Sequence, residues 1–495
     1  MAVDRMSPLD SSFLHIEDGV THMHIGSVSI MEGPPPPYRA LRDMVAGKLG
    51  LVPRYRQVVR RVPFDLGRPV WANDPYFNLE YHLRRTALPR PGGEGELRRL
   101  VGRVMGQQLD RARPLWEMWM VEGLDHDQWA VISKVHHCMV DGVSGSDLLA
   151  LILDLSPDAV ATEPAPWDAG PTPAGWELAT EAIADMASSP FEMVRAVRAR
   201  TRVPRRAAKQ MWETAAGLRE VIGGLKATTQ SSLNGPIGPH RRWVATSVPV
   251  SDIKAVRREV GGTFNDVVLA VITRGFRDLL EARGESVEHP IRTLVPVSVR
   301  PRDERGRAVG DGSMANRVSA VFAELPIGTA DPVERLRTIS DQMSGIKESK
   351  QALAGESLTN LGGFAPPMLL ALGGRLVTKV SQRSINTVTT NVPGPQMTLY
   401  AAGKRMLRSY PYVPLGMQMR IGVAIFSYDG EAHFGITGDF DTTPDLEVLA
   451  DGIRAGMVEL VAAGDEASNT DTDRDAVTVD LRSHATNGRR ISTEA

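Results

Sequence analysis

Apolar residues in the N-terminal part of the chain recur with two different spacings. Residues 22–31 and 129–135 carry an apolar side chain at about every second position, which predicts strands. Residues 39–51 and 95–109 repeat apolar side chains three and four positions apart, which predicts amphipathic helices. Strands and helices therefore alternate here, as expected of an αβ domain.

Two further segments complete this N-terminal domain, to which we assign residues 1–175. Residues 143–155 are predominantly apolar and predict a buried helix that ends before Ser156 and Pro157. Residues 157–175 are rich in proline, alanine and glycine, and this composition predicts an exposed connector.

The next segment, residues 176–240, has helical spacing without strand signals and predicts a helical linker. It contains seven basic residues with no acid between them. The simpler interpretation is a solvated helix face, and the alternative is contact with anionic lipid headgroups or CoA phosphates. These residues are Arg195, Arg198, Arg200, Arg202, Arg205, Arg206 and Lys209.

A second αβ domain is expected over residues 241–465. Residues 292–300 and 420–428 predict strands, and residues 265–280 predict a helix. Residues 466–495 are polar, charged and nearly free of aromatic side chains, which predicts a disordered tail.

The composition is typical of a soluble globular protein and argues against several classes of partner, site and membrane segment. The net charge is −2, which gives no overall attraction to nucleic acid or to an anionic membrane. A single cysteine excludes an internal disulfide framework and a cysteine-rich zinc site, and it suits a reducing cytoplasm. We find no secretory signal at the N-terminus, and no run of about eighteen apolar residues that would predict a transmembrane helix.

The most informative segment is His136-His137-Cys138-Met139-Val140-Asp141-Gly142, which follows the predicted strand 129–135. Successive side chains of a strand point to opposite faces, so only one of the two histidines can face a given site. A neutral imidazole is the best general base near pH 7. A zinc site is excluded, because adjacent strand histidines diverge while metal ligands converge. Cys138 is interpreted as a small core residue, since no activating partner for a thiolate can be named.

The HHxxxDG pattern of these residues resembles the signature of acyltransferases built on the chloramphenicol-acetyltransferase fold. Within that group the chain resembles the bacterial wax ester synthase/diacylglycerol acyltransferase family, and the resemblance covers residues 6 to 462. HHxxxDG alone is moderately specific, but its order with further motifs is strong. These are Leu9 to Leu14, Pro114-Leu115-Trp116, Asn265-Asp266 and Asn391 to Pro395.

The resemblance implies an α/β (α+β layered) fold, with two chloramphenicol-acetyltransferase-like domains joined by the helical linker and a tunnel between them. It implies that His137 is the general base and that His136 has a supporting, structural role. It further implies that Asp141 forms an ion pair that shapes the site, for which Arg300 is our candidate partner. An aspartate that caps the following helix is the alternative role for Asp141.

Other motif residues are expected to build the site without taking part in the chemistry. Gly142 would give room for the acyl chain, and Asn265 with Asp266 would form scaffold. Pro114, Leu115 and Trp116 form either a wall of the channel or ordinary core, and Asn391 belongs to a rigid turn that lines the tunnel. The oxyanion donor is left open among Ser384, Thr390 and Asn391. The apolar residues 361–372 either touch membrane, line the tunnel or form a buried core helix.

The activity that the family implies is transfer of a long acyl chain from acyl-CoA to a hydroxyl group. Acyl-CoA is then a co-substrate, and no bound cofactor or metal is expected. Diacylglycerol is the first choice of acceptor and a long-chain alcohol the second, and the arginine-, alanine- and glycine-rich composition is typical of a bacterium with high genomic GC content. We expect a cytoplasmic protein that associates peripherally with the membrane or with lipid droplets.

Two alternative functions belong to other classes. The first is a condensation domain or polyketide-associated acyltransferase that takes its donor from a carrier protein, against which the lack of adjoining carrier sequence counts. The second is a non-catalytic lipid-droplet protein of the same fold, which the intact HHxxxDG motif disfavours.

Overall fold

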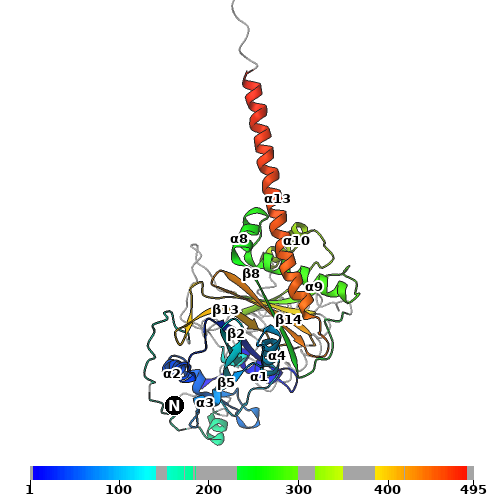
Figure 1. Ribbon diagram of the computed structural model, residues 1–495. Helices are drawn as coiled ribbons and strands as arrows, with labels where there is room; N and C mark the ends of the chain where they lie inside the picture. Colours follow the sequence, from blue (N-terminus) through cyan, green and yellow to red (C-terminus); the bar gives the residue numbers. More distant parts are fainter. Residues whose placement is uncertain are drawn as a thin grey trace, which may run out of the picture.

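The fold was obtained as a computed structural model. It describes residues 4–140, 153–164, 166–171, 173–181, 184, 231–298, 318–348, 385–416 and 418–487. Figure 1 shows two large sheets in these ranges, each covered by helices, with a long C-terminal helix that leaves the body at one end.

The first six-stranded sheet carries the histidine motif at the end of a central strand. Its strands are antiparallel, except that β5 and β6 run parallel. In spatial order they are β12 (Tyr400–Ala401), β13 (Lys404–Tyr412), β2 (His24–Met31), β7 (Gln128–His136), β6 (Trp116–Leu124) and β5 (Leu83–Ala87). The strands predicted at 22–31 and 129–135 are confirmed as β2 and β7.

The second six-stranded sheet belongs almost wholly to the C-terminal half. Its strand β11 runs parallel to both neighbours, and the remaining pairs are antiparallel. The spatial order is β10 (Val318–Leu325), β9 (Ile291–Ser298), β11 (Thr387–Pro393), β14 (Ile421–Tyr428), β15 (Glu431–Asp439) and β8 (Arg241–Pro249). The strands predicted at 292–300 and 420–428 correspond to β9 and β14.

A small third sheet lies at the N-terminal end of the body. It consists of β1 (Asp4–Arg5), β4 (Val70–Asn73) and β3 (Gln57–Arg60), all antiparallel. Short 3-10 helices surround it, namely η1 (Leu49–Leu51), η2 (Pro53–Arg56) and η3 (Pro63–Asp65). The connector that precedes residue 175 crosses this sheet, where Asn73 donates a hydrogen bond to the Ala169 carbonyl at 3.1 Å.

The helices of the N-terminal half are α1 (Pro8–Ile16), α2 (Tyr38–Lys48), α3 (Leu79–His82) and α4 (Glu94–Met105). The predictions at 39–51 and 95–109 are confirmed as α2 and α4. The prediction of a helix at 143–155 is wrong at its end. There Asp154 exchanges two backbone hydrogen bonds with Tyr400, the first residue of β12, at 2.8 Å each. Residues 143–152 lie outside the described ranges. Pairing with a distant strand outweighed the local apolar pattern.

The second sheet is covered by α8 (Val250–Glu259), α9 (Phe264–Ala282), α10 (Pro332–Glu348) and the first turns of α13 (Leu446–Asn487). Helix α9 begins at a capping box. The Asp266 carboxylate accepts a hydrogen bond from the Thr263 amide at 2.8 Å, and the Thr263 hydroxyl accepts one from the Asp266 amide. This cap satisfies amides that have no partner inside the helix, and the helix predicted at 265–280 is confirmed.

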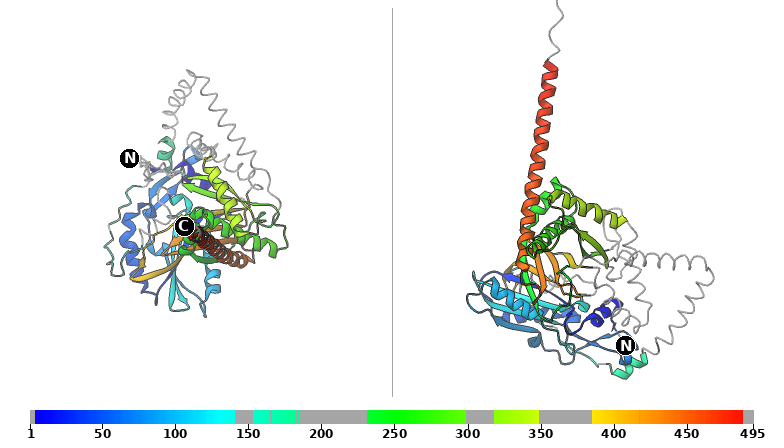
Figure 2. Two further views of the ribbon diagram at one scale, coloured as in Figure 1. Left: turned by 90° about the horizontal axis from the view of Figure 1, so that it is seen from above. Right: turned by 90° about the vertical axis from the view of Figure 1, so that its right-hand side faces the viewer.

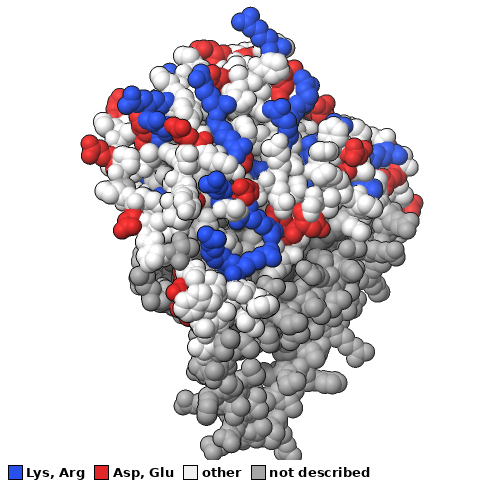
Figure 3. Space-filling model, turned by 90° about the horizontal axis from the view of Figure 1, so that it is seen from below, with Lys and Arg blue, Asp and Glu red and all other residues white. Residues whose placement is uncertain are grey.

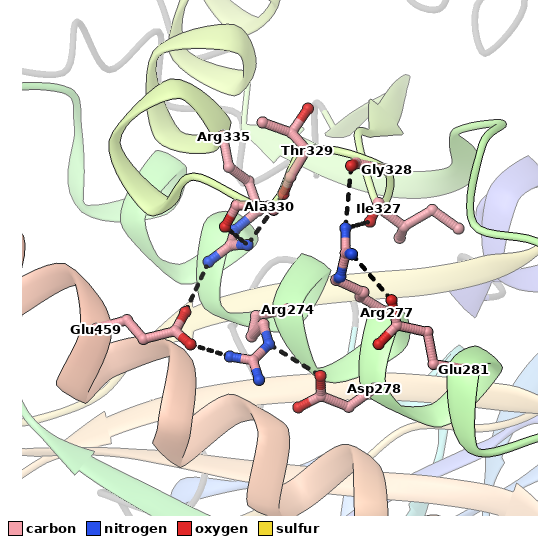
Figure 4. Close-up of polar contacts among 10 residues, drawn as sticks. All are labelled: Arg274, Arg277, Asp278, Glu281, Ile327, Gly328, Thr329, Ala330, Arg335 and Glu459. Carbon is pink, nitrogen blue, oxygen red and sulfur yellow. Dashed lines mark hydrogen bonds and ion pairs between the residues drawn. The ribbon is translucent and has the colours of Figure 1, made fainter.

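Arginine side chains tie the turn between β10 and α10 to two other helices (Figure 4). Arg277 of α9 donates to the carbonyls of Ile327 and Gly328 at 3.0 Å. Arg335 of α10 is buried, and it contacts the next two carbonyls of the turn and, at 3.3 Å, Glu459 of α13. Glu459 also binds Arg274 of α9, so one carboxylate joins three helices.

Helix α13 extends to Asn487, into the segment for which the sequence predicts a disordered tail. Figures 1 and 2 show its outer part standing away from the body. Residues 465–487 contain neither glycine nor proline, so nothing in their sequence interrupts a helix begun at Leu446.

The two halves of the chain are interlocked by β12 and β13, which come from the C-terminal half and complete the first sheet. Strand β13 pairs with β2, so that Met406 lies opposite Met31 and Tyr412 lies opposite Gly26. Strand β13 also contacts the second sheet, at Gly435 of β15. A Cβ added to Gly435 would lie 1.7 Å from the carbonyl oxygen of Pro411 in β13. The two sheets therefore meet at a glycine because no side chain fits there.

We predict that Gly435→Ala lowers the free energy of unfolding by about 3 kcal/mol, since a methyl group cannot be placed without separating two strands. Gly345→Ala, in α10 where no atom lies within 4 Å, is the matched control. It should leave stability unchanged or raise it by up to about 1 kcal/mol through helix propensity. Chemical denaturation of both variants measures this, and equal stabilities would contradict a close contact at the joint.

Candidate active site

The two motif histidines lie where β7 passes into a short 3-10 helix, η4 (His137–Met139). The strand ends at His136, one residue beyond the predicted segment 129–135, and His137 starts the turn. The His136 amide donates to the Leu115 carbonyl at 2.9 Å, and the His137 amide donates to the Met23 carbonyl at 2.8 Å. The backbone just before β6 and just before β2 therefore holds both histidines in place.

His136 is buried, and its side chain stabilises the turn that follows it. Its Nδ1 accepts a hydrogen bond from the Cys138 amide at 3.1 Å, which caps η4. In a neutral imidazole the other nitrogen then carries the proton. That nitrogen, Nε2, lies 3.5 Å from Oε2 of Glu17, and both side chains are 1% exposed. His136 thus joins the turn to a buried carboxylate.

Glu17 follows the last turn of α1 and is held by Arg111, whose Nε lies 2.9 Å from Oε2. Burial raises the pKa of the Glu17 carboxyl group, but the hydrogen bonds and charges of His136 and Arg111 outweigh it and lower the pKa to about 2. The carboxylate is therefore ionised at neutral pH. The sequence analysis missed both Glu17 and Arg111. The one available signal was an acid at the C-terminal end of a helix, where a negative charge is unfavourable.

His137 faces a different neighbour on the same helix. Its ring lies against the ring of Phe13, with the centroids 4.0 Å apart and the planes tilted by 32°, and it keeps partial solvent contact. Burial lowers the pKa of His137 to about 4, and the nearby charge of His136 acts in the same direction. The imidazole is therefore neutral at pH 7 and able to accept a proton.

Pro114, Leu115 and Trp116 are buried beside the histidine turn. Leu115 supplies the carbonyl that holds His136, as described above. Trp116 begins β6, where its indole N–H donates to the Tyr55 carbonyl at 2.8 Å and its ring stacks on His82 at 4.7 Å. These residues support the turn through the backbone and fill the core beneath it.

Comparison with known proteins decides the family. The model of the wax ester synthase/diacylglycerol acyltransferase catalytic domain matches residues 6–268, and that of the WS/DGAT C-terminal domain matches residues 314–461. The chain belongs to this family. It is therefore an acyltransferase, and the family and fold predicted from the motifs are confirmed.

Two relatives illustrate the match. The chain is 37% identical over 464 residues to a probable diacylglycerol O-acyltransferase of Mycobacterium tuberculosis, covering 93% of this chain and 96% of the relative. The solved wax ester synthase/diacylglycerol acyltransferase of Marinobacter aquaeolei superposes with a TM-score of 0.65 at 28% identity, covering 93% and 99%. A condensation domain of the calcium-dependent antibiotic synthetase, 14% identical with a TM-score of 0.56 over 93% and 96%, shares the fold.

The other family motif residues lie in separate elements. Asp266 contacts Thr263 and, at 3.3 Å, the Ser340 hydroxyl, while the half-buried Asn265 precedes it in the first turn of α9. Asn391 lies in β11 opposite Ile425 and is also half-buried. Three predicted site residues, Asp141, Gly142 and Arg300, lie outside the described residues, as do Ser384, the basic run 195–209 and the apolar segment 361–372.

Cys138 is a buried free thiol in the core cluster beneath the turn. Burial raises the pKa of this thiol well above its usual value, so it stays protonated and is a poor nucleophile. This agrees with its interpretation as a core residue. Within the described ranges, no group of three or more histidine, cysteine or acidic side chains could hold a metal ion.

A crevice of about 230 Å³ opens at the opposite end of β7 from the histidines, beside Gln128. It is lined by Trp243 and Tyr410 together with residues of α4. Seven strand residues lie between Gln128 and His136, so eight steps of about 3.3 Å place the crevice roughly 25 Å from the histidine turn. The crevice is therefore not part of this site.

We predict that Glu17→Gln weakens both stability and turnover, because it removes the charge that pairs with Arg111 and His136. The loss of unfolding free energy should be on the order of 2–3 kcal/mol, moderated by the solvent contact that Arg111 retains. Glu122→Gln, which breaks the exposed pair with Arg85, is the control and should cost at most about 1 kcal/mol.

The pH dependence of this effect follows from the lowered pKa of Glu17. The contribution of the carboxylate is complete above its ordinary pKa of 4.5 and is lost as the pH falls through about 2. Urea unfolding of wild type and variant should therefore show a constant difference at neutral and mildly acidic pH. A difference that disappears already near pH 6 would contradict the assigned ion pair.

Proposed function

We propose that this protein transfers a long acyl chain from acyl-CoA to the free hydroxyl group of diacylglycerol, with His137 as the general base. The observation that carries the proposal is the position of His137 on the turn at the end of β7, packed against Phe13, where burial favours a neutral imidazole. The family supplies the reaction type, and the names of its relatives support diacylglycerol as acceptor. A long-chain alcohol, giving a wax ester, is the second acceptor.

The reaction requires two proton transfers at His137, one to the imidazole and one from it. The acceptor hydroxyl gives its proton to the imidazole as its oxygen attacks the thioester carbonyl carbon, because a neutral alcohol is a poor nucleophile. The tetrahedral intermediate then expels the CoA thiolate, which takes the proton from the imidazolium. The products are an ester and free CoA, and no covalent enzyme intermediate is needed.

A pKa of about 4 suits the second half of this reaction. It makes neutral His137 a weaker base than an exposed histidine, yet it ensures that the imidazole is unprotonated when substrate arrives. The resulting imidazolium is a correspondingly strong acid, which favours return of the proton to sulfur. Low solvent access around the ring therefore assists departure of CoA.

The remaining roles are those that the family motif implies. We propose that Asp141 pairs with Arg300 to shape the site and that Gly142 leaves room for the acyl chain. Asn265, Asp266 and the Pro114 to Trp116 segment are assigned to scaffold, and Asn391 to the tunnel lining.

Diacylglycerol resides in a lipid phase, so the enzyme has to meet it at a lipid surface. Among the described residues no helix is long and apolar enough to cross a bilayer. We propose peripheral association from the cytoplasmic side with a membrane or lipid droplet.

We predict that His137→Ala lowers the rate of acyl transfer by a factor of about 10² to 10⁴, the usual contribution of a general base, while the fold is retained. His136→Ala should lose stability together with activity, since it removes the cap of η4. Labelled palmitoyl-CoA with detergent-dispersed diacylglycerol or hexadecanol, resolved by thin-layer chromatography, measures turnover. A His137 variant with near-normal turnover would refute the assignment, and esterification of hexadecanol alone would exclude diacylglycerol as acceptor.

The pH profile gives a separate prediction. In wild type, kcat/KM should fall only as the pH approaches about 4, because His137 is neutral above its pKa. Phe13→Ala admits water to the ring, so the pKa should rise toward 6.5 and the acid limb should move to higher pH. Phe77→Ala, which removes the ring stacked on His82, is the control and should leave the limb in place.

The same pKa shift affects stability with a defined sign. Because the unfolded chain binds a proton at His137 below about pH 6.5 and the folded protein does not, stability falls as the pH drops from 6.5 to about 4. Rates should therefore be compared where circular dichroism shows that both variants are folded. An unchanged acid limb in Phe13→Ala would mean that the Phe13 ring does not set the protonation of His137.

A further inference from the structure

Two large aromatic side chains project from one end of the molecule. Phe64 of η3 is 94% exposed, and Trp176, in the helical residues 175–181, is 69% exposed. They belong to one tip, since a Cβ on Gly175 would lie only 3.5 Å from Pro63, the neighbour of Phe64. Below them Leu178, Val62 and Val70 share an apolar cluster. The tip is therefore supported by a small apolar core of its own.

The backbone at Phe64 is strained in a way that presents its ring to the outside. Its φ is 58°, in the left-handed region that bulky residues seldom adopt. Such a conformation is unfavourable and persists only where surrounding structure enforces it. Here the enforced conformation places an apolar ring in water, which is unfavourable for the isolated protein.

Cationic side chains flank the aromatic pair. Arg60 and Arg61 are exposed at the end of β3, and Arg68 follows the turn that carries Phe64. Asp65 is the single acid between Arg60 and Arg68. On the helical side, the Glu177 carboxylate accepts a hydrogen bond from the Ala174 amide and so serves the helix start. Aromatic anchors beside arginines match a phospholipid surface, with an apolar boundary beneath anionic headgroups.

The tip connects directly to the catalytic turn. Arg68 donates to the Met6 carbonyl and the Met6 amide donates to the Pro69 carbonyl, both at 2.9 Å, so the start of the chain is fastened to the tip. Helix α1 begins two residues later, and its Phe13 lies against His137. A nine-residue helix spans roughly 13 Å, which an acyl chain or a glycerolipid readily covers.

The views of the whole molecule agree with this placement. Residues 175–181 lie at the end of the body opposite to the one from which α13 leaves (Figures 1 and 2). Figure 3 looks onto the molecule from that side, where basic and acidic side chains are both spread between uncharged surface.

We propose that the tip formed by Phe64 and Trp176, with Arg60, Arg61 and Arg68 around it, is the docking surface by which this acyltransferase enters a phospholipid interface. The inference rests on the proposed function, because an acceptor that resides in a lipid phase requires the enzyme to bind a lipid surface. Both rings insert at the boundary between headgroups and acyl chains, and the arginines contact phosphate groups.

The test measures binding of the full-length protein to vesicles by flotation. The vesicles are pure phosphatidylcholine, or phosphatidylcholine with about one third phosphatidylglycerol. The variants are Phe64→Asn, Trp176→Ser, the double variant and Arg60→Gln/Arg61→Gln. Asparagine tolerates a positive φ, so Phe64→Asn should relieve strain while removing the anchor. Val458→Ser, a 70% exposed apolar position on α13, is the matched control.

Each aromatic variant should reduce the vesicle partition coefficient about tenfold, as expected for the loss of one inserted ring. The arginine variant should weaken binding to vesicles that contain phosphatidylglycerol and leave binding to phosphatidylcholine nearly unchanged. Val458→Ser should bind like wild type. Wild-type binding by the double variant, equal loss in Val458→Ser, or no vesicle binding by wild type would each overturn the proposal.

Turnover on detergent-dispersed diacylglycerol separates this inference from the proposed function. The double variant should keep wild-type turnover in detergent and lose turnover on diacylglycerol embedded in vesicles. If wild type fails in detergent, the proposed function fails, whatever the vesicle result. If turnover in detergent is normal and the double variant still docks, only the docking surface is wrong.

Discussion

The buried contact of Glu17 with His136 and Arg111 is the interaction on which the catalytic geometry depends. It fastens the end of α1 to the turn that follows β7, and the same helix then brings Phe13 against His137. An ionised carboxylate in this position would be costly without partners, so the three side chains hold one another in place. Burial is the main cause of the lowered pKa of His137.

A second constraint is the exchange of β12 and β13 into the first sheet. The chain crosses from one half to the other, and the halves meet where Gly435 leaves no room for a side chain beside Pro411. Pieces of the C-terminal half therefore support the sheet that carries His137. An interlocked arrangement of this kind explains why the family motifs are distributed over nearly the whole length of the chain, although the chemistry is assigned to one short turn.

The strained residue Phe64 and His137 lie at two ends of one continuous path. The tip is joined to the start of the chain through Met6, and α1 continues from there to the histidine turn. The proposed docking surface and the proposed reaction centre are therefore joined by one element, which holds them at a fixed separation.

The sequence by itself determined the family and the main strands and helices, because these depend on motifs and on local periodicity. It did not reveal Glu17 or Arg111, which lie far apart in sequence from His136 and meet it only through packing. It also misplaced the end of the 143–155 segment. There, pairing of Asp154 with Tyr400 decided the outcome. Partners brought together by long-range folding leave no local pattern, so only the tertiary structure could assign them.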